Sequence, residues 1–306
     1  MPLDTDVAEM LTMLAASKAP ALSEGTIAEA RANYDGAPKP AGDAVARVED
    51  HTVEGPAGEI PVRLYASTQR TDLPIVVFFH GGGWVLSSVD GHDPIARRIA
   101  ASSGAMVVSV DYRLAPEDPF PAPHDDCWAV TAWLAEQGTK WGGDPTKIAV
   151  CGDSAGANLA AGVAIRGRDE GLALALQALI YPCIDDRQSD YPSMSDNSEG
   201  YFLTAADVTW FWDHFVPAAH RRDPRAVPAR LEQMTGLAPA FVQTAEFDPL
   251  RDEGEQYAQR LIDAGVPTTL VRYPGVVHGF VTRWHTMARA EQAHNDLAEA
   301  LKTAFG

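Results

Sequence analysis

Six short stretches of the chain are almost continuously apolar and rich in β-branched and aromatic residues. Such stretches are typical of strands that are buried on both faces, as in a parallel sheet. They lie at 75–79, 106–110, 148–151, 176–181, 241–244 and 268–273. Segments with helical periodicity lie between or after them, near 93–102, 124–137, 155–168, 253–264 and 286–304. This alternation predicts an α/β fold with a mainly parallel sheet, flanked by helices and joined by right-handed crossovers.

Two parts of the chain depart from this alternation. Residues 5–17 and 23–33 have helical periodicity, and residues 46–65 alternate around a Gly-Pro-Ala-Gly turn, which predicts an antiparallel hairpin at the sheet edge. Between 181 and 241 a polar insertion leads into a capped, aromatic-rich helix at 204–212. We expect the N-terminal helices and this insertion to form a cap. Packing of the aromatic stripe in the core is equally compatible with its pattern.

Composition narrows the range of functions. A chain of 306 residues, 46% of them hydrophobic, can bury the core of one large α/β domain. Its formal net charge of -18 disfavours nucleic acid and anionic membranes as partners. A common acidic surface and adaptation to high salt are both compatible with that charge.

Targeting and cysteine patterns indicate a cytoplasmic protein. No stretch approaches the roughly 20 apolar residues of a membrane span, and the acidic N-terminus does not resemble a secretory signal. Three cysteines without metal-ligand spacing are typical of reduced thiols in a core, so we expect no metal site.

The most informative stretch is 148–159, where an apolar run breaks into Gly152-Asp-Ser-Ala-Gly156 and continues as a helix. A serine on a sharp strand-to-helix turn projects its hydroxyl into open space, and the turn requires very small residues two positions before and after it. Gly152 and Gly156 meet that requirement. The pattern therefore predicts Ser154 as a nucleophile, with the N–H of Ala155 at the helix start facing any developing oxyanion.

Three consecutive glycines follow the first buried strand of the parallel set, in His80-Gly81-Gly82-Gly83-Trp84. Glycine is costly in backbone entropy, and close approach of backbone amides to a ligand is the usual reason for such a run. We expect the N–H groups of Gly82 and Gly83 to join that of Ala155 as three donors to an oxyanion. His80 is interpreted as a structural hydrogen-bonding group behind the loop.

A nucleophilic serine needs a base, and the base needs an acid that orients it. Of the nine histidines, His278 lies in a glycine-flanked loop directly after the last predicted strand. Asp248 lies in the turn after the penultimate strand and is the favoured acid, with Glu246, Asp252 and Glu253 nearby as alternatives. The order Ser, Asp, His along the chain matches the α/β-hydrolase arrangement.

Five motifs together resemble the hormone-sensitive lipase family of bacterial carboxylesterases, within the α/β-hydrolase superfamily. They are His80-Gly-Gly-Gly83, Asp111-Tyr-Arg-Leu-Ala-Pro-Glu117, Gly152-Asp-Ser-Ala-Gly156, Asp248-Pro-Leu-Arg-Asp-Glu-Gly254 and His278-Gly-Phe280, in that order. The resemblance covers the chain from about residue 45 to its end. It implies an eight-stranded core with a helical cap, and hydrolysis of short- to medium-chain acyl esters without a cofactor.

The resemblance also implies roles for single residues. Ser154 would be the nucleophile, His278 the base and Asp248 the orienting acid. Gly82, Gly83 and Ala155 would be the oxyanion donors, whereas Arg113 and Glu117 would be structural.

We expect four segments. Residues 1–45 would form N-terminal cap helices and a linker, 46–185 the first part of the core, 186–225 a cap insertion, and 226–306 the second part of the core. The cap would close an acyl pocket for chains of roughly four to eight carbons. Its candidate lining residues are Trp84, Phe202, Leu203, Trp210 and Phe211.

Two other functions stay open at this point. An amidase or peptidase could use the same residues, because a triad alone does not choose the leaving group. A non-catalytic small-molecule receptor is disfavoured, because Ser154, Asp248 and His278 are all present. The expected partner is a small-molecule ester. The oligomeric state is open, with a homodimer as one candidate.

Overall fold

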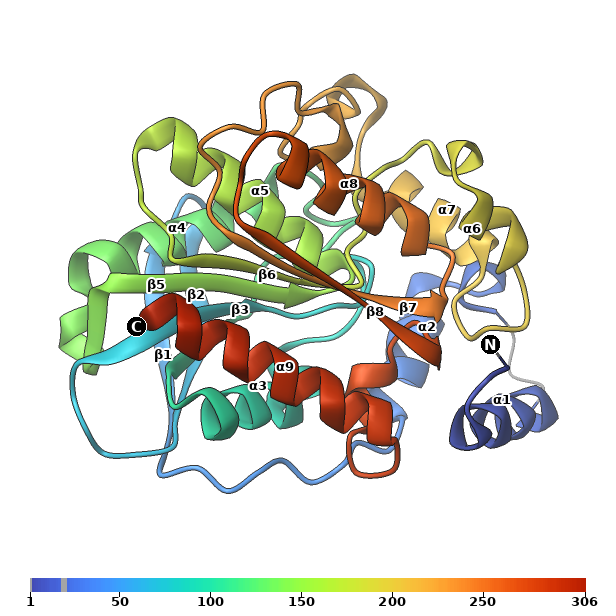
Figure 1. Ribbon diagram of the computed structural model, residues 1–306, viewed down its shortest axis with the longest axis horizontal. Helices are drawn as coiled ribbons and strands as arrows, with labels where there is room; N and C mark the ends of the chain where they lie inside the picture. The colour runs from blue at the N-terminus through green and yellow to red at the C-terminus, as the bar shows by residue number, and fades with distance from the viewer. Residues whose placement is uncertain (1, 18–20) are drawn as a thin grey trace.

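Within the residues that the computed structural model describes, 2–17 and 21–306, one sheet of eight strands runs through the protein (Figure 1). Its order is β1-β2-β4-β3-β5-β6-β7-β8. The strands are β1 (Arg47–Gly55), β2 (Gly58–Ala66), β3 (Leu73–Phe79), β4 (Met106–Val110), β5 (Gly143–Asp153), β6 (Leu176–Ile180), β7 (Ala240–Phe247) and β8 (Thr268–Val277). β1 and β2 pair antiparallel at one edge, and every pair from β4 to β8 is parallel. The predicted α/β fold with a mainly parallel sheet is confirmed.

Helices cover both faces of this sheet (Figure 1). α4 (Ala122–Gln137), α5 (Ala155–Glu170) and α8 (Arg251–Asp263) lie on one face, and α3 (Val89–Ser103) and α9 (Ala288–Phe305) lie on the other. Side chains alternate along each strand, so β3 contributes Ile75, Val77 and Phe79 to the core on one side and Val76 and Phe78 to the other. A strand with two buried faces has to be apolar throughout, which explains its continuous hydrophobic run.

The N-terminal segment and the polar insertion meet near the carboxyl ends of the parallel strands (Figure 1). The segment contains α1 (Thr5–Ser17) and α2 (Ile27–Gly36), and the insertion contains α6 (Pro192–Asp196) and α7 (Ala205–Phe215). The Ser23 N–H donates to Asp207 Oδ1 at 3.0 Å, which ties the two together. Asp207 also completes a capping box with Thr204, so α7 begins where its sequence predicts.

The start of α2 differs from the sequence expectation. Residues 22–24 form a 3₁₀ turn, and the helix begins only at Ile27. The reason is a capping box, in which the Thr26 hydroxyl accepts from the Glu29 N–H and the Glu29 carboxylate accepts from the Thr26 N–H. This box satisfies the first free donors of the helix at Thr26, so Ser23 is left outside it.

Candidate active site

The candidate nucleophile lies at the sharp turn between β5 and α5. Ser154 has φ 57° and ψ −117°, a conformation that costs a non-glycine residue about 1–3 kcal/mol. Its N–H donates to Ile180 O at 2.9 Å, which helps to hold this strained backbone. The flanking glycines have no room for a side chain, because a Cβ on Gly156 would lie 2.0 Å from Phe79 O, and one on Gly152 would lie 2.3 Å from Gly156 O. The glycine requirement predicted for the motif is therefore a steric one.

Three predicted residues from distant parts of the sequence form one hydrogen-bonded row. His278 Nε2 lies 2.9 Å from Ser154 Oγ, and His278 Nδ1 lies 2.7 Å from Asp248 Oδ2. Asp248 is fully buried, and its other oxygen accepts from the Leu250 N–H at 2.9 Å. An ionised carboxylate only accepts, so Nδ1 carries the imidazole proton and Nε2 is free to accept from the serine hydroxyl. This is the proton arrangement that a general base needs.

The other carboxylates considered from the sequence are occupied elsewhere. Asp252 accepts from the Ser193 N–H at 2.7 Å, and Glu253 accepts from the Ile184 N–H at 2.6 Å. Glu246 accepts from the Gly275 N–H at 2.8 Å. Among the described residues, the carboxylate hydrogen-bonded to the His278 ring is that of Asp248.

The glycine loop after β3 adopts backbone conformations that favour glycine. Gly82 has φ +116° and Gly83 has φ +61°. The N–H groups of these two residues and of Ala155 donate no hydrogen bond within residues 2–17 and 21–306. Ser154 and Gly82 are both half-buried and accessible from solvent. Within the described structure, none of the three N–H groups is therefore taken up by another hydrogen bond.

His80 lies behind this loop and is fully buried. Burial lowers the pKa of His80 to about 3, so the ring is neutral at physiological pH. Its Nδ1 lies 2.8 Å from Gly81 O, and the Tyr112 ring stacks on it at 4.3 Å. These contacts fix the backbone at the start of the glycine loop and place the imidazole away from solvent.

Two of the five candidate pocket residues pack under or over the glycine loop. Trp84 is 1% exposed, and its ring stacks on Phe215 at 4.1 Å and lies 4.8 Å from Trp212. This places it in the core beneath α7. Phe211 lies directly over the loop, because a Cβ on Gly83 would lie 2.0 Å from its ring.

The other three candidates lie in and before α7. Phe202 is 50% exposed and has φ +76°, and its ring would lie 3.2 Å from a Cβ on Gly279, the neighbour of His278. Leu203 is 9% exposed. The half-buried Trp210 ring lies 4.4 Å from His214 on the same helix. Phe202 and Phe211 therefore lie on the two sides of the site, next to the base and next to the glycine loop.

Sequence analysis gave no role to three buried groups that border the site. The Tyr181 ring lies 4.4 Å from the His278 ring, and the Asn197 side-chain amide donates to Asp248 O at 3.2 Å. Asp153 is the last residue of β5, directly before the serine, and a carboxylate at the end of a continuous apolar strand could have drawn attention to it. No local pattern identifies the tyrosine or the asparagine, because only the folded chain brings them to the site.

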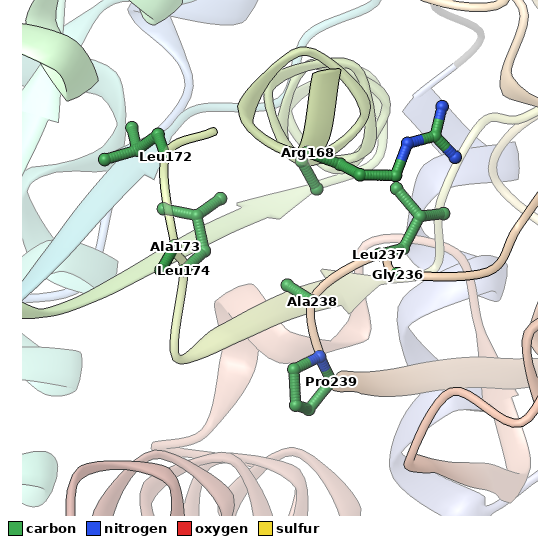
Figure 2. Close-up of a pocket in the computed structure, with 9 residues that line it drawn as sticks. Arg168, Leu172, Ala173, Leu174, Gly236, Leu237, Ala238 and Pro239 are labelled. Atoms are coloured by element: carbon green, nitrogen blue, oxygen red, sulfur yellow. The ribbon is translucent and has the colours of Figure 1, made fainter. Parts of the chain in front are cut away.

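A separate pocket of about 210 Å³ lies at the opposite end of the sheet (Figure 2). It is lined by residues that precede β6 and β7, with Arg168 of α5 at its side. The guanidinium donates to Gln233 O and Asp169 Oδ1. The pocket shares no residue with the site at Ser154. Within the described ranges, no three His, Cys, Asp or Glu side chains converge as a metal site.

The chain was compared with known proteins. A family model for the alpha/beta hydrolase fold matches residues 76–282. Carboxylesterase NlhH of Mycobacterium tuberculosis is 44% identical over 267 residues, which are 85% of this chain and 83% of that protein. An arylesterase of Saccharolobus solfataricus is 39% identical over 78% of each chain. A solved hyperthermophilic esterase from Pyrobaculum calidifontis superimposes with a TM-score of 0.93, at 40% identity and 99% coverage of both chains.

Within residues 2–17 and 21–306, no helix is both long and apolar enough to cross a bilayer.

Proposed function

Because this chain belongs to the α/β-hydrolase fold family, in its hormone-sensitive lipase-like branch, and is a carboxylic ester hydrolase, we propose that it is a serine carboxylesterase acting through an acyl-enzyme. The observation that carries the proposal is the hydrogen-bonded row from Ser154 through His278 to the buried Asp248, at 2.9 and 2.7 Å. The substrates are small esters with short- to medium-length acyl chains.

In the proposed reaction, each step has a named atom that performs it. Ser154 Oγ attacks the ester carbonyl while its proton moves to His278 Nε2, and the carbonyl oxygen becomes an oxyanion facing the N–H groups of Gly82, Gly83 and Ala155. Collapse breaks the bond to the alcohol, which takes the proton from Nε2. Water then gives a proton to Nε2 and attacks the acyl-enzyme, and a second collapse releases the acid and restores the serine hydroxyl.

Asp248 stabilises the positively charged imidazole that forms in both halves of the reaction. Its two oxygens accept hydrogen bonds from His278 Nδ1 and from the Leu250 N–H, and these contacts hold the ring in one orientation throughout. Its complete burial keeps water from competing for the imidazole N–H.

Contacts in two segments support a cap over the site, for which we propose residues 1–45 and 186–225; residues 1 and 18–20 of this range lie outside the described structure. In α2, the Arg31 guanidinium donates to Val85 O at 2.9 Å and to Ala115 O at 3.0 Å, and it pairs with Glu117 at 2.7 Å. In the insertion, Phe211 lies over Gly83. These contacts support a cap, because they bring α2 and the Phe211 ring against the glycine loop. The homodimer and the cytoplasmic location stay predictions.

The closing wall favours acyl chains of roughly four to eight carbons, since each buried methylene adds about 0.8 kcal/mol until the wall is met. A series of p-nitrophenyl esters of increasing chain length measures this through kcat/KM. A rate that keeps rising to the longest chains would rule out a closed pocket while leaving the triad untouched.

The test of the mechanism uses Ser154→Ala and His278→Ala with p-nitrophenyl butyrate. Each variant should lose at least about 10³-fold in kcat with its melting temperature retained, because nucleophile and base act as a unit. Wild-type protein should also be labelled covalently by an organophosphonate, and Ser154→Ala should not. A variant that keeps a tenth of wild-type turnover would contradict the assignment. A faster reaction with p-nitroanilides than with matched esters would favour the amidase alternative.

A further inference from the structure

The loop that carries the oxyanion donors holds several residues in strained backbone conformations. Besides Gly82 and Gly83, two residues with side chains have positive φ, namely Trp84 at 61° and Ser87 at 76°. Each such residue costs about 1–3 kcal/mol and persists only where the surrounding structure enforces it. The position of the Gly82 and Gly83 N–H groups therefore depends on what holds both ends of this loop.

The first end of the loop is held by the residue before the candidate nucleophile. The Gly81 N–H donates to Asp153 Oδ1 at 2.9 Å, and a Cβ on Gly81 would lie 2.5 Å from Asp153 Oδ2. Burial raises the pKa of the Asp153 carboxyl, but the neighbouring His92 ring and the hydrogen bond from the Gly81 N–H more than offset this, and the pKa stays below its ordinary value. Asp153 is thus an ionised acceptor for the loop.

One imidazole joins that carboxylate to the other end of the loop. His92 of α3 has Nε2 at 3.3 Å from Asp153 Oδ1 and Nδ1 at 2.8 Å from Ser87 Oγ. All three residues are buried, with 2% of His92, 4% of Asp153 and 8% of Ser87 exposed. The same Nε2 also lies 3.3 Å from the Gly81 N, so this ring nitrogen meets the carboxylate and the loop backbone together, while the Ser87 hydroxyl lies at Nδ1.

We propose that His92 is a positioning residue for the oxyanion hole. By binding Asp153 and Ser87 at once, it fixes both ends of the segment 81–87 and so sets the place of the Gly82 and Gly83 N–H groups. The inference rests on the proposed esterase function. His92 itself touches no reacting atom, and it acts through the loop.

The outer side of the same loop faces the N-terminal helix α2. Arg31 donates to Val85 O at 2.9 Å, and the Tyr34 hydroxyl lies near Ser87. Burial raises the pKa of Tyr34, so its hydroxyl keeps its proton and adds no charge beside the loop. The loop is therefore held between His92 on one side and α2 on the other.

The experiment replaces the imidazole by an apolar ring of similar size, in His92→Phe, and follows p-nitrophenyl butyrate hydrolysis. Loss of one oxyanion donor typically costs about 10²–10³ in kcat, so displaced donors should cost about 10–100-fold, with KM changed by less than about twofold. The matched control is His124→Phe. His124 is also buried and lies between the rings of Phe120 and Phe215, without contact to Gly81 or Asp153 in the described structure.

A second readout separates positioning from a general loss of stability. A trifluoromethyl ketone adds to the serine and leaves an oxyanion in the hole, whereas the matching methyl ketone binds without forming one. In His92→Phe the inhibition constant of the first should rise by about the same factor as kcat falls, and that of the second should change by less than about twofold. His92→Gln, whose amide offers one donor and one acceptor as the neutral imidazole does, should recover part of both losses.

The inference would be overturned if both ketones inhibited His92→Phe more weakly by the same factor, or if the kcat of His92→Phe stayed within about twofold of wild type. If His92→Phe does not fold, Ser87→Ala decides by the same two measurements, because it removes the bond to Nδ1 and leaves the imidazole and Asp153 in place. If the wild-type protein hydrolyses esters and the variants match it in both measurements, the inference is wrong and the proposed function still stands. Wild-type protein that neither hydrolyses esters nor binds the trifluoromethyl ketone would reject the proposed function as well.

Discussion

Asp248→Asn replaces one carboxylate oxygen of the candidate triad by an amide nitrogen and leaves the size of the side chain almost unchanged. The carboxylate now accepts from His278 Nδ1 at 2.7 Å through Oδ2 and from the Leu250 N–H at 2.9 Å through Oδ1. In the variant, the amide oxygen is expected to keep the backbone N–H, so the NH₂ group faces Nδ1. Nδ1 must then be the acceptor, and the imidazole proton moves to Nε2, which faces Ser154.

The expected loss follows from that wrong tautomer. The same substitution in a serine protease lowers kcat by about 10⁴-fold, which corresponds to about 5.4 kcal/mol of barrier. Asp248 is fully buried, so water cannot restore the ordinary tautomer from that side. Substrate binding should be nearly unchanged, because the carboxylate does not line the open part of the site.

Asp252→Asn is the matched control, four positions along the chain. Asp252 accepts from the Ser193 N–H and from Arg251 Nε, both away from His278. We expect its kcat to stay within about threefold of wild type, with a small loss of thermal stability. Steady-state kinetics with p-nitrophenyl butyrate, at active-site concentrations titrated by an organophosphonate, compares the two variants. A large loss in Asp252→Asn with little change in Asp248→Asn would refute the triad as assigned.

Two further predictions concern stability. Burial raises the pKa of the Glu253 carboxyl well above its ordinary 4.5. Its contribution to the free energy of unfolding is therefore fully present below pH 4.5 and is lost as the pH rises towards the higher pKa of the folded state. Glu253→Gln should therefore gain stability relative to wild type between about pH 4 and pH 8, measured as the shift of urea midpoints; a gain that shrinks with pH would contradict this sign. Gly156→Ala should lower the stability of the fold by about 1–3 kcal/mol or more, because its Cβ would lie 2.0 Å from Phe79 O. The control Gly36→Ala would meet no atom within 4 Å, so it should be neutral or slightly stabilising. Thermal melts compare the two variants.

The sequence alone was enough to predict the elements and the candidate triad residues. Strands buried on both faces need continuous apolar runs, and the turn at Ser154 needs glycines on both sides, so these requirements leave local patterns. The order of Ser154, Asp248 and His278 added a second constraint. The serine and the histidine are 124 residues apart in sequence, and this separation does not predict how close they lie in space. They are close because parallel strands end at the same edge of the sheet.

Tertiary structure decided which groups meet around that edge. His92 and Asp153 are 61 residues apart, and no periodicity marks either as a partner of the glycine loop. Trp84, predicted as a pocket residue, lies in an aromatic cluster with Phe215 and Trp212, because the strained loop turns its side chain toward α7. Local propensity specifies helices, strands and turns through interactions between near neighbours, whereas hydrogen bonds across the site depend on how those elements pack. The sequence thus determined the α/β architecture and the candidate reacting groups, and only the packing of distant elements determined which side chains surround them.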